Sequence, residues 1–158
     1  MFEALLSSET AESAAVSNQK RFKTRPKSQG MKVMRTARKI LVVEDELWSA
    51  LDMEWVIRKL GHDVVGPVAT AKEALELADE LRPDLVLMDI RLANDDDGID
   101  TAIAARQRFN IPSIFVSAHG DLPTRNRAAS ANPSGFIEKP FTPETLANAI
   151  AQALDPDD

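Results

Sequence analysis

Short apolar runs alternate along the chain with longer stretches in which apolar residues recur every three or four positions. The runs are typical of buried β-strands, and the longer stretches are typical of amphipathic helices. Their regular alternation from Lys39 onward is typical of βα units, in which helices connect parallel strands. Five strands are predicted at residues 40–43, 63–66, 85–88, 114–116 and 135–137, each followed by a helix, at residues 47–60, 70–81, 98–109, 122–130 and 143–154.

Three helix boundaries carry specific signals. Gly61 follows the first helix, where a glycine in the left-handed conformation ends many helices. Thr70 and Glu73 have the spacing of a capping box, and Thr142 precedes a proline at the first helical position. The third strand is apolar throughout, which favours a strand covered on both faces. About 120 residues of this pattern predict one α/β domain, a doubly wound five-stranded parallel sheet with helices on both faces.

Residues 1–38 differ in composition from the rest of the chain. They hold eight lysines and arginines against three acidic residues, whereas residues 39–158 hold 11 basic and 22 acidic residues. No apolar periodicity is sustained within this first stretch, so it could bury too little surface to offset the entropy cost of ordering it. We therefore expect a basic, disordered extension at residues 1–38 and a folded domain at residues 39–158.

The overall composition narrows the class of protein. The chain is 44% hydrophobic, enough for one ordinary core, and it contains no cysteine, which excludes disulfides, thiolate metal sites and cysteine nucleophiles. Its apolar runs are too short to cross a bilayer, and its N-terminus lacks the pattern of a secretion signal. These features lead us to expect a cytoplasmic protein without a membrane span.

Polar residues follow four of the five predicted strands. Glu44 and Asp45 come after the first strand, Asp89 after the third, Ser117 after the fourth and Lys139 after the fifth. Open parallel sheets bind ligands beyond the carboxyl ends of their strands, so these side chains are expected to converge. Any one of them could be a helix cap or a turn residue, but their joint occurrence favours a functional site.

The residue types at these strand ends suggest a particular chemistry. Three carboxylates held together repel one another unless a cation lies among them. An all-oxygen site with positions open to water suits Mg²⁺ better than zinc. A hydroxyl and an ammonium group opposite the cation would complete a cradle for the oxygens of a transferring phosphoryl group. The strand ends therefore predict a site for Mg²⁺ and phosphoryl transfer.

Four motifs give the region from about residue 39 to residue 154 a specific resemblance. They are "ILVVEDE", "PDLVLMDIRL", "IFVSAH" and "GFIEKPF", in this order. Together they resemble the receiver domain of two-component response regulators. The resemblance implies a flavodoxin-like sheet with strand order 2-1-3-4-5. It also implies a phosphoprotein that accepts a phosphoryl group from a sensor histidine kinase or a phosphotransfer protein.

The resemblance assigns roles to the acidic residues. Asp89 matches the aspartate that is phosphorylated, and Asp45 matches a direct Mg²⁺ ligand. Glu44 matches an acid that holds a metal-bound water, and the carbonyl of Arg91 matches a backbone ligand of the metal. The following loop, "ANDDDG", is about one residue longer and more acidic than in many receivers, and Ala93 stands where many have proline.

The resemblance also assigns roles on the other side of the site. Ser117 matches the switch hydroxyl that bonds the phosphoryl group, and Phe136 matches the aromatic partner of that switch. Lys139 matches the lysine that pairs with the phosphoryl group, and its bond to the following proline is expected to be cis. Arg91 and His119 occupy positions that tend to govern access of water to the acyl phosphate, although His119 could equally be a solvated loop residue.

Only about four residues follow the last predicted helix, so we expect a single-domain regulator without a C-terminal effector domain. Its output would then pass through protein contacts, a homodimer among them. We do not expect an enzyme, beyond catalysis of its own phosphorylation and dephosphorylation. An alternative is a Mg²⁺-dependent aspartyl-phosphate phosphatase of the haloacid dehalogenase type, but Arg91 stands where that family needs a second acid.

A further alternative gives the basic extension a function of its own, as an arm that binds nucleic acid or an acidic partner. Its basic residues permit contact with phosphates, but there is no folded motif and only Phe22 could stack on a base. A solvated linker or an upstream start codon is the simpler interpretation, and nucleic acid is not expected as a partner. A dinucleotide-binding or P-loop protein is disfavoured because acids stand where a glycine-rich turn would be needed.

The helix predicted at residues 47–60 has two apolar stripes, whereas packing on a sheet needs only one. The resemblance to receiver domains implies that the stripe facing the sheet consists of Met53, Val56, Ile57 and Leu60. The second stripe, expected to face outward, consists of Leu47, Trp48, Leu51 and Trp55. An exposed patch of this kind is costly on a monomer, so the second stripe is predicted to bind a partner.

The first candidate for that partner is the kinase, because in similar proteins this helix packs against the kinase's helical bundle. The alternatives are the chain's own Phe2, Leu5 and Leu6, or a second copy of the domain. A structural alternative is that one or both tryptophans turn inward beneath a neighbouring helix.

Overall fold

The computed structural model describes residues 36–157. The prediction of a disordered extension at residues 1–38 therefore lies almost wholly outside the described residues, as do Phe2, Leu5 and Leu6. Within the described part of the chain, no helix has both the length and the apolar character that a membrane span requires.

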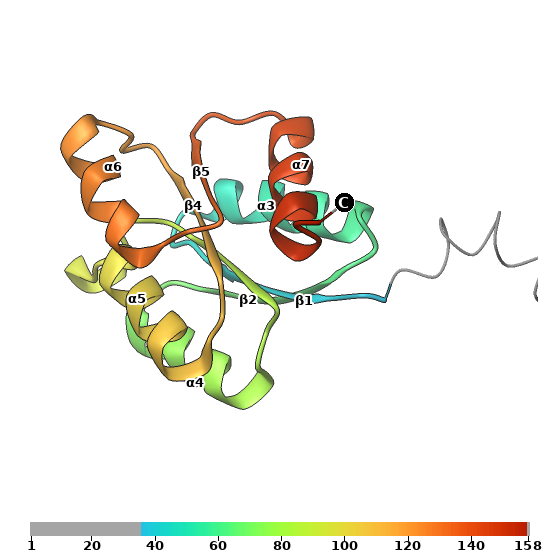
Figure 1. Cartoon of the computed structure of the whole chain (residues 1–158), viewed down its shortest axis with the longest axis horizontal. Helices are drawn as coiled ribbons and strands as arrows, with labels where there is room; N and C mark the ends of the chain where they lie inside the picture. The colour runs from blue at the N-terminus through green and yellow to red at the C-terminus, as the bar shows by residue number, and fades with distance from the viewer. Residues whose placement is uncertain (1–35, 158) are drawn as a thin grey trace, which may run out of the picture. The chain divides into compact units, whose positions relative to one another are not determined.

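Five parallel strands form one sheet with the order β2-β1-β3-β4-β5 (Figure 1). Their bounds are β1 Lys39–Val43, β2 Asp63–Val68, β3 Leu85–Met88, β4 Ser113–Ser117 and β5 Gly135–Glu138. This architecture confirms the predicted fold class and strand order. Because every strand runs in the same direction, the carboxyl ends of all five lie along one edge of the sheet.

Helices cover both faces of this sheet, as a doubly wound fold requires. Their bounds are α3 Leu47–Lys59, α4 Ala71–Leu81, α5 Gly98–Phe109, α6 Leu122–Ala128 and α7 Pro143–Leu154. One buried cluster joins the sheet to α3 and α7, and a second joins its other face to α4, α5 and α6. Figure 1 shows α3 and α7 together on one side and α4 and α5 together on the other.

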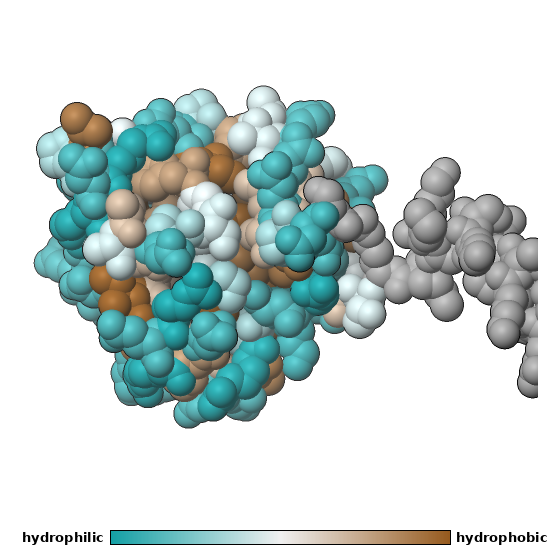
Figure 2. Space-filling view, in the orientation of Figure 1, coloured by the Kyte–Doolittle hydropathy of each residue, from teal (hydrophilic) through white to brown (hydrophobic). Residues whose placement is uncertain are grey.

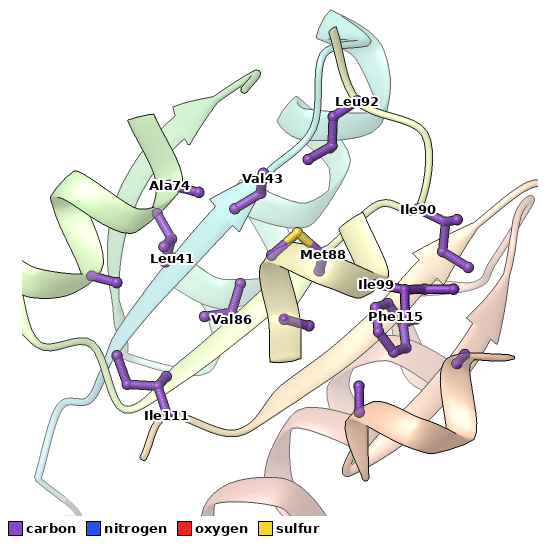
Figure 3. Packing of buried hydrophobic residues seen from close by; sticks show 14 of the residues in the cluster. Leu41, Val43, Ala74, Val86, Met88, Ile90, Leu92, Ile99, Ile111 and Phe115 are labelled. Atoms are coloured by element: carbon purple, nitrogen blue, oxygen red, sulfur yellow. The ribbon is translucent and has the colours of Figure 1, made fainter. Parts of the chain in front are cut away.

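The second of these clusters is packed around the central strands. Leu41, Val86 and Phe115 from three neighbouring strands meet Ala74 of α4 and Ile99 of α5 there (Figure 3). Small residues on the helices let them approach the sheet closely, while the larger residues of the strands fill the space between. Hydrophilic residues cover most of the face of the domain seen in Figure 2, with smaller apolar areas between them.

Several predicted boundaries differ from the structure, most of them by one residue. The helix predicted at residues 122–130 ends at Ala128 and continues as the short 3₁₀ turn Ala129–Ala131. Strand β2 extends to Val68, because Pro67 lies in an edge strand, where the missing N–H costs little. Leu60 is the C-cap of α3 and is 37% exposed, so it does not belong to the stripe that packs on the sheet.

The predicted helix signals are confirmed. Gly61, just beyond α3, has a φ of 84°. At the start of α4 the Thr70 hydroxyl accepts a hydrogen bond from the Glu73 N–H at 3.2 Å and donates one to the Glu73 carboxylate. Thr142 caps α7 by accepting from the Thr145 N–H. These side chains satisfy N–H groups that have no partner within their helices.

We expect Thr70→Ala to lower the free energy of unfolding by about 1 kcal/mol, because it removes the hydroxyl that caps α4. Urea denaturation followed by circular dichroism measures this change. Thr70→Ser is the matched control, since it keeps the hydroxyl and should retain most of the stability. Equal losses in the two variants would show that the methyl group, and not the cap, matters at this position.

Candidate functional site

Three carboxylates meet at the carboxyl edge of the sheet, as their sequence positions predicted. Glu44 and Asp45 follow β1, and Asp89 follows the neighbouring strand β3. One oxygen from each lies within 4.8 Å of the others. The pairing of β1 with β3 brings them together, because the Asp89 N–H donates to the Val43 carbonyl across the two strand ends.

Glu44 is the most deeply buried of the three. Its side chain is inaccessible to solvent, and its Oε1 accepts a hydrogen bond of 3.0 Å from the Glu46 N–H. Burial raises the pKa of Glu44 above its ordinary value of 4.5, although hydrogen bonds from Lys139 and Glu46 act in the opposite direction. The charge of Asp89 raises this pKa further.

Asp89 lies between the backbone and a lysine. Its Oδ1 accepts from the Ile90 N–H at 2.7 Å, and its Oδ2 accepts from Lys139 Nζ at 3.1 Å. The side chain is 11% exposed, so the carboxylate is held in place and can still be reached from solvent. These two hydrogen bonds orient an acid that lies beside two others.

Lys139 follows β5 and reaches back across the edge of the sheet. Its ammonium group donates to Glu44 as well as to Asp89. Burial works against the charged form of Lys139, but its hydrogen bond to Glu44 and the charge of Asp89 outweigh burial and raise the pKa of Lys139 above 10.5. The Lys139–Pro140 peptide bond is cis, as predicted.

Ser117 ends β4 beside this lysine. It is fully buried, and its carbonyl accepts from the Lys139 N–H at 3.0 Å. The Ser117 hydroxyl accepts from the N–H of His119 at 3.2 Å, which orients it within the loop that follows the strand. The edge of the sheet thus brings a hydroxyl and an ammonium group to the same end of the domain as the acids.

The charge balance of this cluster fits a divalent cation. Lys139 is the one cation that the hydrogen bonds and ion pairs of the described residues place on the acids, and three carboxylates are present. Asp45 is exposed to solvent, so a cation could reach it from outside. Carboxylate oxygens with access to water are the ligands that Mg²⁺ prefers, so the donor set suits this ion.

Arg91 and His119 line one pocket next to Asp89. The pocket, about 360 Å³ in volume, lies between the loops that follow β3 and β4. Arg91 and Asp97 lie opposite each other in a short antiparallel bridge. Its two hydrogen bonds run from the Gly98 N–H to the Ile90 carbonyl and from the Leu92 N–H to the Asp96 carbonyl. Neither of these bonds uses the Arg91 carbonyl, the atom predicted to bind the metal.

Phe136 of β5 has a neighbour that the sequence did not predict. Its ring is 6.1 Å from that of Phe115, and the guanidinium of Arg125 lies over it at 4.3 Å. Arg125 also pairs with Glu138 at 3.3 Å, so one side chain of α6 is bound to two residues of β5. No local sequence pattern predicts these contacts of Arg125, because they depend on where α6 packs against the sheet.

Gly98 is a second residue that the sequence analysis missed as part of the site. A Cβ at this position would overlap the backbone carbonyl of Asp89, and its N–H donates to the Ile90 carbonyl at 2.7 Å. Asp97 just before it caps α5 and pairs with Arg127 of α6. The run of acids ending in glycine is the signal that could have identified this close approach.

The second apolar stripe of α3 faces outward, as predicted. We call it the α3 face; its members and their exposed fractions are Leu47 62%, Trp48 73%, Leu51 41% and Trp55 54%. The structural alternative, in which a tryptophan turns beneath a neighbouring helix, is wrong for this domain. Met53, Val56 and Ile57 of the opposite stripe are buried on the sheet.

Comparison with known proteins assigns this arrangement to a family. The family model of the response regulator receiver domain matches residues 40–151. The chain belongs to this family. In this receiver, the acids and the lysine lie at the strand ends where the resemblance placed them.

Curated relatives include several response regulators. The phyllosphere-induced regulator PhyR of Methylorubrum extorquens is 38% identical over 120 residues, which cover 75% of this receiver's chain and 44% of PhyR. The transcriptional regulatory protein PdtaR of Mycobacterium tuberculosis is 32% identical over 74% of this chain and 57% of its own length. The chain thus spans about half the length of these two relatives. The chemotaxis protein CheY of Thermotoga maritima is 33% identical, with 72% of this chain and 94% of CheY covered.

Solved structures agree with this assignment. The signal receiver domain of a modulated diguanylate cyclase from Desulfovibrio desulfuricans is 35% identical, with a TM-score of 0.71 over 77% of this chain and 96% of that one. A CheY-like receiver domain protein from Methanospirillum hungatei is 25% identical, with a TM-score of 0.70 and the same coverage of both chains. Both carry the fold described above.

The raised pKa of Glu44 makes a prediction for the metal-free receiver. A raised pKa means that the folded state holds this proton more tightly than the unfolded state does. Its contribution to stability is therefore complete below pH 4.5 and is lost as the pH rises through the pKa of the folded state. Urea denaturation at a series of pH values, with a chelator present, should show this loss of stability.

Glu44→Gln should remove that component of the pH dependence, because the side chain no longer titrates. Glu80→Gln, which changes an exposed glutamate on α4, is the control and should keep the wild-type profile. Identical profiles for Glu44→Gln and the wild type would contradict the assignment of a raised pKa to Glu44.

Proposed function

We propose that this receiver accepts a phosphoryl group on Asp89 from the phosphohistidine of a sensor histidine kinase or a phosphotransfer protein. The observation that supports this most is the position of Asp89, next to two further acids and in contact with the ammonium of Lys139. Attack by a carboxylate needs no general base, because a carboxylate oxygen carries no proton to remove. Positioning and charge neutralisation are what the transfer demands.

In the proposed step, a carboxylate oxygen of Asp89 attacks the phosphorus of the phosphohistidine. A P–O bond forms as the P–N bond breaks, and the imidazole leaves with the electron pair of that bond. The product is an acyl phosphate on Asp89. Lys139 would then exchange its contact with the free carboxylate for one with the phosphoryl oxygens, and the Ser117 hydroxyl would donate to another.

We propose that Mg²⁺ is held by Asp45, Asp89 and the Arg91 carbonyl, with Glu44 holding a metal-bound water. When bound, the cation supplies positive charge beside the phosphoryl oxygens. Glu44 and Asp89 already share Lys139, so the exposed Asp45 is the acid with the least compensation among the described contacts. This fits a site that binds the metal at its solvent-facing side.

We propose further roles for five residues around the phosphoryl group. Ser117 and Phe136 form the switch pair, and the Arg125 guanidinium over the ring is positioned to respond when Phe136 moves. Arg91 and His119 face one pocket beside Asp89, and there they would govern how easily water reaches the acyl phosphate.

We propose that the phosphodonor docks on the α3 face. This helix begins immediately after the acids, so a partner seated on Leu47 and Trp48 lies next to Asp89. Large, exposed aromatic side chains are the residues that most often anchor such contacts. The kinase's own helices would supply the matching apolar surface.

Asp89→Asn should abolish acid-labile phosphorylation, because it removes the nucleophilic oxygen and keeps the shape of the side chain. Labelling with acetyl phosphate in Mg²⁺, followed by gel electrophoresis, measures this. Asp45→Ala should lose labelling as well, since it removes a metal ligand, whereas Asp100→Asn on the surface of α5 is the control. Labelling that persists in Asp89→Asn would overturn the proposed function.

Trp48→Ala and Leu51→Ala should slow phosphotransfer from a kinase and leave labelling by acetyl phosphate nearly unchanged. Docking requires the α3 face, whereas the small phosphodonor needs only the site. Leu122→Ala, which changes a side chain 70% exposed on α6, is the matched control. Equal loss of both activities, or loss of neither, would show that the α3 face is not the docking surface.

A further inference from the structure

The α3 face combines a protruding side chain with a depression. Trp48, the most exposed of its four residues, stands at the N-terminal half of the helix. A shallow groove of about 500 Å³ begins at Leu51 and continues toward the C-terminal end of the helix, and its wall includes Trp55 and Arg58. Trp48 and the groove follow one another along one helix. Two copies related by a rotation of 180° can therefore each place Trp48 in the groove of the other copy.

The charges around this face have the same complementary arrangement. The exposed acids Asp45 and Glu46 lie at the N-terminal end of α3, and the exposed bases Arg58 and Lys59 lie at its C-terminal end. In an antiparallel pair of α3 helices, the acidic end of one helix meets the basic end of the other. The dipoles of two antiparallel helices also favour this arrangement.

We propose that a second copy of this chain covers the α3 face, with the two α3 helices packed antiparallel about a twofold axis. Trp48 of each copy fills the groove beside Trp55 of the other. This self-complementarity of shape and charge is the reason to propose a second copy, which covers the face whenever no phosphodonor is docked on it. The dimer requires no phosphorylation, so its existence is independent of the function proposed above.

The size of the face determines how strong this dimer is. A helix of 13 residues is about 20 Å long, so one helix pair buries less than the roughly 800 Å² per partner of a standard interface. The dimer is therefore weak and in rapid exchange with the monomer. A phosphodonor seated on the same face excludes the second copy, so the dimer lowers the concentration of receiver that is free to dock.

Both tryptophans of the chain lie on this face, and the chain has no tyrosine, so its intrinsic fluorescence reports on the α3 face alone. The experiment is sedimentation equilibrium of the full unphosphorylated chain from low micromolar to submillimolar concentration, with emission spectra of the same samples. We expect a monomer–dimer equilibrium. The tryptophan emission should shift to shorter wavelength as the dimer fraction rises.

Leu51→Glu places a charge at the centre of the face and should abolish both the dimer and the spectral shift. Leu122→Glu is the control, because it changes a more exposed leucine on α6, away from the face, and should leave both unchanged. Circular dichroism melting confirms that each variant is folded.

A second test addresses the charged ends of the helix. Glu46→Lys and Lys59→Glu should each weaken the dimer, and the double variant should restore it.

Three outcomes would overturn the proposal. The first is a full chain that stays monomeric at every concentration. This holds if its emission is that of exposed tryptophan, and also if the emission is already at shorter wavelength because another part of the chain covers the face. The second is a dimer that persists in Leu51→Glu, which would place the interface elsewhere. The third is a double charge variant that dimerises no better than either single variant.

Discussion

Repulsion among the carboxylates at the ends of β1 and β3 is the constraint on which the rest of this receiver depends. Glu44 and Asp89 are both buried, and burial of like charges is tolerated only where other groups compensate. Lys139 supplies one such group, and the N–H groups of Glu46 and Ile90 supply two more. Lys139 directly follows β5, so the compensation of these acids depends on the position of β5 in the sheet.

The loop after β3 connects the acids to the helices on one side of the sheet. Asp96 accepts from the Ala71 N–H at the start of α4, and Asp97 pairs with Arg127 of α6. Gly98 lets the same loop pass directly against the backbone of Asp89. A change in charge at Asp89 therefore occurs within a loop that is already bonded to two helices. On the opposite side, α3 starts next to the same acids, so both surfaces of the domain are close to the site.

Much of the site could be predicted because parallel topology brings all strand ends to one edge. Once the strands were assigned from their apolar runs, Glu44, Asp89, Ser117 and Lys139 had to lie there together. The spacing of residues along the helix predicted two apolar stripes on α3, and the resemblance to receiver domains indicated which of them faces outward. The role of Arg125 could not be predicted, because its contacts with β5 join segments that no local pattern links.

Local pattern is therefore enough to predict the order of the elements, the edge at which the acids meet and the two apolar stripes of α3. Each of these follows from local periodicity and from the rules for connecting parallel strands. The pairing of charged side chains, such as Lys139 with Glu44 and Arg127 with Asp97, emerges only from the packed fold. Long side chains cross gaps between elements, and the width of those gaps depends on how the helices pack on the sheet.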